Sequence, residues 1–86
     1  MPRFIDHHSM PPMSPEQVKA MMARVKSDIE SKKPDKFGVK MLNSFTAPGE
    51  AWGYSDAPNA EAVVKYHEAM GIKLDIRDVK QVTPVV

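Results

Sequence analysis

Cysteine is absent from this sequence of 86 residues, and no run is long and apolar enough to span a membrane. Without cysteine the chain has no disulfides, thiolate zinc sites or cysteine nucleophiles. The first residues also lack the apolar centre of a secretory signal peptide, so we expect a cytoplasmic protein with no membrane partner. We expect a chain this short to form a single domain, residues 1–86, supported by close packing, a bound metal or self-association.

Neither sign of charge dominates, because 12 Lys and Arg stand against 11 Asp and Glu. The charges are mixed along the chain, which gives no broad positive field for nucleic acid. Trp52-Gly53-Tyr54 faintly resembles the aromatic core of the RNA-recognition motif, but no Lys or Arg precedes it. We therefore expect no nucleic-acid partner. Phosphate loops and nucleophile elbows are missing too, so the sequence favours no catalytic residue.

The order of the expected elements defines the fold class. Residues 3–8 alternate as a short strand, and Ser14, Pro15 and Gln17 form the capping box of a first helix, which Pro34 ends. Strands follow at 37–46 and 51–55 around a turn at 47–50, then a helix at 60–70 and a last strand at 78–85. This βαββαβ order predicts an α+β, ferredoxin-like domain, with a four-stranded antiparallel sheet and both helices on one face.

The strands carry apolar residues on both faces. Simple alternation places Met41 and Phe45 on one side of their strand and Leu42 on the other. A sheet with one solvent-exposed face should alternate more cleanly. We therefore expect the helix-free face to be covered by a second copy of the chain in a homodimer.

Three histidines, His7, His8 and His67, are the candidate metal ligands. Neighbouring strand residues point to opposite faces, so only one of His7 and His8 can face the helices. His67 lies on the apolar stripe of the second helix and should meet that histidine in the helix–sheet cleft. Asp6, Glu68 and Asp75 are candidate oxygen donors, and Met10, Met13 and Met70 candidate soft donors. The competing interpretation is a buried His67 that is hydrogen-bonded to a backbone carbonyl.

Trp52 and Tyr54 stand on one side of the third strand, with Gly53 between them. They are typical of an aromatic wall, which suggests an alternative function: a dimeric α/β-barrel-type enzyme or binder of small molecules. In that interpretation Trp52, Tyr54 and His67 line one binding cleft. Core or interface packing of the two aromatic rings is the simpler explanation.

The whole chain resembles a family of short bacterial proteins that includes a dimeric, ferredoxin-like nickel-binding protein. The resemblance is carried by the opening Met1-Pro2-Arg3-Phe4, by Ser14-Pro15-Glu16-Gln17, and above all by the second helix, in which His67 stands before Gly71. It implies a dimer with His67 near the sheet and a bound transition metal, nickel first, with copper or zinc as alternatives. Storage, buffering or delivery of the ion would be its role. Many members carry Glu or Arg on the strand that here holds His7 and His8, so the resemblance leaves the ligand set open.

Overall fold

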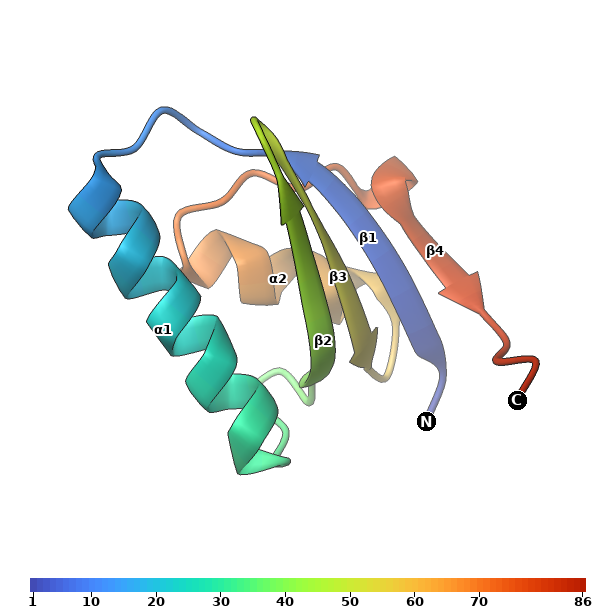
Figure 1. The fold of residues 1–86 in the computed structure, drawn as a ribbon. Helices are drawn as coiled ribbons and strands as arrows, with labels where there is room; N and C mark the ends of the chain where they lie inside the picture. The colour runs from blue at the N-terminus through green and yellow to red at the C-terminus, as the bar shows by residue number, and fades with distance from the viewer.

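The computed structural model describes all 86 residues and has the expected βαββαβ order. Its elements are β1 (Arg3–Ser9), α1 (Pro15–Ser31), β2 (Lys40–Ala47), β3 (Glu50–Asp56), α2 (Ala60–Ala69), the 3₁₀ helix η1 (Ile76–Asp78) and β4 (Val79–Val82). All pairings in the sheet are antiparallel and the strand order is β2-β3-β1-β4 (Figure 1). The ferredoxin-like α+β fold predicted from the sequence is confirmed. None of the helices has the length and apolar character that crossing a membrane requires.

Local sequence explains where the helices begin. The Ser14 side chain accepts a hydrogen bond from the backbone of Gln17, whose own side chain accepts one from the backbone of Ser14, which completes the expected capping box. Asn59 caps α2 by accepting from the backbone N–H of Ala62. Gly71 follows α2 with φ of 77°, a conformation that glycine adopts without strain.

A β-bulge in β2 changes which side chains share a face. Met41 pairs with Ser55, whereas Asn43 pairs with Tyr54, so Leu42 is an extra residue on this strand. Beyond the bulge the alternation reverses, and Phe45 pairs with Trp52 on the helix-free face. The expectation that Met41 and Phe45 lie on one face was therefore wrong. Met41 enters the core while Phe45 is exposed.

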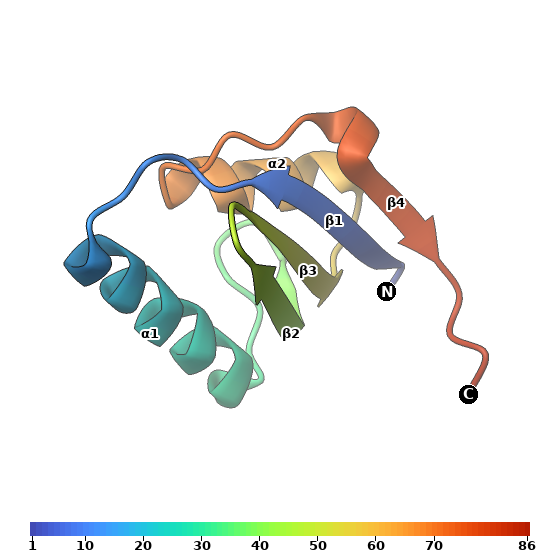
Figure 2. The ribbon, with the colours of Figure 1, turned by 45° about the horizontal axis from the view of Figure 1, so that its top comes forward.

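The core lies between the sheet and α2. Its buried residues come from β1, β2, α2, β4 and the connecting segments beside them: Phe4, Val39, Met41, Ala57, Ala62, Val63, Tyr66, Leu74 and Val79. Helix α1 has no buried residue and only Ile29 packs against this cluster. Figure 2 shows α1 standing off at the β2 side of the sheet, while α2 lies across it. The two helices therefore have different roles, since α2 forms the core and α1 covers its open end.

Candidate metal centre

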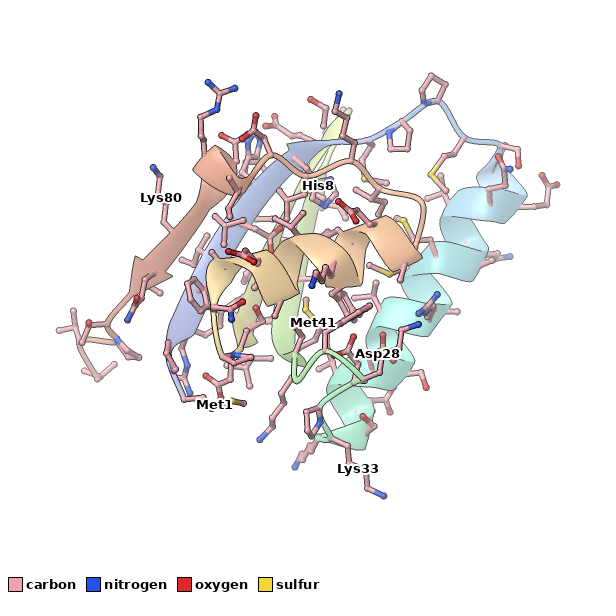
Figure 3. The ribbon with its side chains drawn as sticks, turned by 180° about the vertical axis from the view of Figure 1, so that it is seen from behind. Met1, His8, Asp28, Lys33, Met41 and Lys80 are labelled. Carbon is pink, nitrogen blue, oxygen red and sulfur yellow. The ribbon has the colours of Figure 1, made fainter.

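Three polar side chains meet in the space between α2 and the sheet. Asp6 and His8 come from β1, two residues apart, and so point to the same face of the strand. His67 comes from the last turns of α2. All three side chains are buried, with Asp6 fully inaccessible to solvent. Figure 3 shows His8 in the layer between α2 and the sheet.

The ligand atoms of Asp6, His8 and His67 lie within 4.8 Å of one another. His67 Nε2 is 3.3 Å from Asp6 Oδ1, the distance of an ion pair when the His67 ring is protonated. Two ligands of a tetrahedral ion, each about 2.0–2.1 Å from the metal, are themselves about 3.3–3.4 Å apart. The spacing of these two atoms therefore matches that of a pair of metal ligands.

Both histidines have one ring nitrogen fixed by a backbone carbonyl. His67 Nδ1–H donates to the carbonyl of Val63 at 2.8 Å, and His8 Nδ1–H donates to that of Ser9 at 3.1 Å. In the neutral ring this leaves each Nε2 with a free lone pair. Histidines that bind metals almost always have this arrangement, because the second bond sets the tautomer and the ring orientation. The backbone contact expected of a structural His67 is thus present, but it accounts for only one of the two nitrogens.

The two imidazoles respond differently to their shared environment. Burial lowers the pKa of His8, and the Ser9 carbonyl offsets this only in part. Burial also lowers the pKa of His67, but the neighbouring Asp6 carboxylate and the Val63 carbonyl outweigh it, so that the net shift is upward. The rings lie edge to face with their centroids 5.0 Å apart. The lowered pKa of His8 favours its neutral form, the form that binds metals, and metal binding by His67 would compete with its proton.

Asp6 is the least satisfied group in the molecule. Neither of its carboxylate oxygens has a hydrogen-bond partner, and the buried Ser55 Oγ has none either. A buried carboxylate in an apolar environment is costly unless a hydrogen bond or a cation compensates it. Gly53, opposite Asp6 in the sheet, makes room for the carboxylate, because a Cβ at Gly53 would overlap Asp6 Oδ2. The fold thus encloses a carboxylate whose nearest oppositely charged neighbour is the His67 ring, 3.3 Å away.

Two histidines and one carboxylate form a ligand set that suits divalent transition metals. Imidazole binds nickel, copper, zinc and iron, and open positions remain for water or a substrate when only three protein ligands are present. His8 and His67 both line a cavity beneath α1, so any open position on the ion would border that cavity. The group Asp6–His8–His67 is called the triad below.

Of the three predicted histidine ligands, the structure brings together His8 and His67 but not His7. The His7 ring lies on the helix-free face, where Nε2 is 2.8 Å from Glu50 Oε1 and the ring packs on Trp52. The alternation of side chains along β1 is the reason, since it sends His7 and His8 to opposite faces. His7 is therefore excluded from the site.

The aromatic wall forms on the helix-free face as well. The Trp52 ring packs on His7 with centroids 5.1 Å apart, and Arg3 lies 5.4 Å from the centre of the Tyr54 ring. Trp52 borders both the cavity beneath α1 and a shallow hollow on the outer face, whereas Tyr54 borders only the outer hollow. A cleft shared by Trp52, Tyr54 and His67 is therefore not formed, because the sheet separates Tyr54 from His67.

The other predicted donors are not part of the triad. Met10 and Met70 line the same cavity as His8 and His67, whereas Met13 does not. Glu68 is exposed on α2, and Asp75 is paired with Arg77 at 2.8 Å. The sequence singled out Asp6 only as one carboxylate among several. The signal that identifies it is its spacing from His8, two residues along one strand. No sequence pattern indicated the roles of Gly53 and Ser55, which depend on the pairing of β1 with β3.

Comparison with protein-family models gives no match. Comparison with curated proteins gives none either. Among solved structures, the chain is similar to SCO4226 from Streptomyces coelicolor A3(2), with 23% sequence identity and a TM-score of 0.65. The match covers 98% of this chain and 99% of the other. At this level of identity the likeness concerns the fold alone, and it places the βαββαβ domain in a bacterial protein of the same length.

Proposed function

We propose that this protein binds a divalent transition-metal ion through Asp6 Oδ1, His8 Nε2 and His67 Nε2. The observation that carries the proposal is the fully buried Asp6 carboxylate, which has no hydrogen-bond partner and lies beside two imidazoles. Backbone carbonyls hold both rings with one nitrogen free, which favours a metal over a purely structural cluster. Water or a small molecule completes the coordination.

A route for the ion supports the same proposal. His8 borders a second, surface hollow that is also lined by Asp75, Asp78 and Lys73. Asp75 is paired with Arg77, so Asp78 and Lys73 are the unpaired charges of this hollow and the entry is close to neutral. His8, which borders both this hollow and the cavity beneath α1, is the ligand through which the ion would reach Asp6 and His67. Such a path suits reversible exchange, as in storage, buffering or delivery of the metal.

Nickel is the first candidate ion, with copper and zinc as the alternatives. Nickel is favoured by the family resemblance carried by His67 and Gly71, whereas the ligand set alone accommodates all three metals. A cytoplasmic location belongs to the same proposal, because a chain without cysteine needs no oxidising compartment.

Adjacent histidines provide the test and its control. His8→Ala removes a triad member, whereas His7→Ala removes the same side chain from the opposite face of the same strand. Isothermal titration with nickel, zinc and copper should give one ion per chain for the wild type and for His7→Ala. We expect a loss of at least about 100-fold in affinity for His8→Ala and for His67→Gln, with circular dichroism confirming that each folds. Equal binding by the His7 and His8 variants would refute the proposal.

We also propose that the helix-free face of the sheet is the interface of a homodimer. Ile5 and Phe45 are 41% and 55% exposed there, next to Trp52 and Tyr54. Together with Val82 and Pro84 they surround a shallow apolar hollow. A face with this many large apolar side chains is typical of a protein–protein contact.

Charge placed on that face tests the dimer. Phe45→Lys should shift the mass measured by light scattering from two chains to one, because a buried lysine at the interface has no partner. Ile76→Lys is the matched control, since Ile76 is 47% exposed on η1, outside the hollow. A wild-type mass of one chain at micromolar concentration would contradict the proposal.

A further inference from the structure

A cavity of about 330 Å³ lies beneath α1. One wall is the apolar stripe of α1, the floor comes from β2 and β3, and the far end is the last part of α2. Because α1 buries none of its own residues, the protein leaves this space unfilled by side chains. Cavities that bind small molecules begin at about 300 Å³, whereas gaps in a packed core rarely exceed a water molecule.

Methionines dominate the walls. Five of the seven methionines in the chain border the cavity: Met10, Met21, Met22, Met41 and Met70. Thioether side chains are flexible and polarisable, so they adapt to ligands of different shape and make favourable contacts with aromatic rings. Val25, Ile29 and Ile72 add branched aliphatic surface. The walls therefore suit an apolar body, and an aromatic one in particular.

The polar end of the cavity is the triad. His8 and His67 are the only residues of the triad in the lining, and their rings close the space on the side where a metal would sit. A divalent ion together with the Asp6 carboxylate leaves one net positive charge at this buried end. A low-dielectric site of that kind favours a ligand that brings a single negative charge.

The size of the cavity selects the class of occupant. Its volume of about 330 Å³ lies at the lower end of the range of about 300–1,000 Å³ for small-molecule sites. The cavity therefore suits a small organic molecule. The Tyr66 hydroxyl also donates a hydrogen bond to Asp28, which ties α2 to α1 and keeps α1 in place as a cover.

We propose that the cavity binds a small apolar organic monoanion, an aromatic or branched aliphatic carboxylate, whose body contacts the methionines and whose head ligates the metal. The proposal rests on the proposed metal binding, and it adds a ligand class to the same site. The head takes the open coordination position bordered by His8 and His67. The metal, the carboxylate head and Asp6 are then neutral as a group, which removes the cost of a buried net charge.

The methionine methyl groups supply a probe with an internal control. We would label them with ¹³C, load the protein with zinc, whose filled d shell leaves NMR signals sharp, and titrate 3-phenylpropanoate. Signals from the five cavity methionines should shift, while those of Met1 and Met13, which lie outside the cavity, should not. The affinity for 3-phenylpropanoate should be at least about 10-fold higher than the affinity for the uncharged 3-phenylpropanol. Acetate, which has no apolar body, should bind about 10-fold more weakly than 3-phenylpropanoate.

Val25→Phe separates this inference from the metal proposal. The substitution fills the cavity from α1 without touching the triad, so we expect zinc binding to persist and the 3-phenylpropanoate shifts to disappear. If zinc, nickel and copper all fail to bind the wild type, the metal proposal fails, and the ligand inference fails with it. If zinc binds but the cavity methyl groups do not respond, or respond equally in Val25→Phe, the ligand inference is wrong and the metal proposal stands.

Discussion

Gly53→Ala is expected to disrupt the centre through a single methyl group. The new Cβ would overlap Asp6 Oδ2 and lie 3.1 Å from both Cγ and Oδ1 of the same carboxylate. Gly53 does not have a positive φ, so its backbone tolerates alanine, and glycine to alanine in a strand normally stabilises by about 0.5–1 kcal/mol. Because the Asp6 side chain is fully buried, moving it overpacks the core and costs about 1–3 kcal/mol.

The two contributions have opposite signs, so a double-mutant cycle separates them. With Asp6 present, Gly53→Ala should lower the free energy of unfolding. In an Asp6→Ala background the carboxylate is gone and the same change should be neutral or stabilising by up to about 1 kcal/mol. We therefore expect a coupling energy of about 2 kcal/mol between the two positions.

Urea denaturation of the metal-free protein, at one fixed protein concentration, measures this coupling. Metal titration measures the second consequence, a loss of about 10- to 100-fold in affinity for Gly53→Ala, because the carboxylate leaves its position beside His67. Equal changes in stability in both backgrounds would show that Asp6 does not occupy the space above Gly53. The geometry that underlies the metal centre would then be refuted.

Three further predictions concern the frame around the site. Tyr66→Phe removes the hydrogen bond to Asp28, so the free energy of unfolding should fall by about 1 kcal/mol and hydrogen exchange in α1 should quicken, with no change in α2. Arg3 lowers the pKa of Asp56 through a direct hydrogen bond. This pair therefore stabilises the fold above the ordinary Asp pKa, and its contribution is lost as the pH falls and Asp56 becomes protonated. The urea midpoint should consequently drop less between pH 7 and pH 3 in Asp56→Asn than in the wild type. Asn59→Ala removes the cap of α2 and should cost about 1 kcal/mol, measured by thermal melting, whereas an unchanged melt would mean that another group caps the helix.

Local sequence signals predicted most of the fold. The capping box at Ser14 and the turn at residues 47–50 depend on short-range interactions, so they could be predicted without knowing what surrounds them. The bulge at Leu42 was not predicted, because it depends on how β2 pairs with β3 rather than on its own residues. Its consequence, Phe45 on the outer face, was missed for the same reason.

The site was predicted in part. Alternation along the strand required that only one of His7 and His8 face the helices, and the helical spacing placed His67 on the buried face of α2. Whether His7 or His8 meets His67, and whether Asp6 lies beside them, depends on which face of β1 is covered by α2. Gly53 and Trp52 likewise acquired their roles only through the pairing of β3 with its neighbours.

The sequence by itself determined the order of the elements, their caps, the absence of thiol chemistry and the spacing that puts Asp6 and His8 on one face. These properties follow from interactions between residues that are near in the chain. Only the tertiary structure decided which face of the sheet is covered, that His67 meets Asp6, and that α1 stands away to leave a cavity. Those outcomes are set by contacts between residues up to about sixty positions apart, which no local pattern encodes.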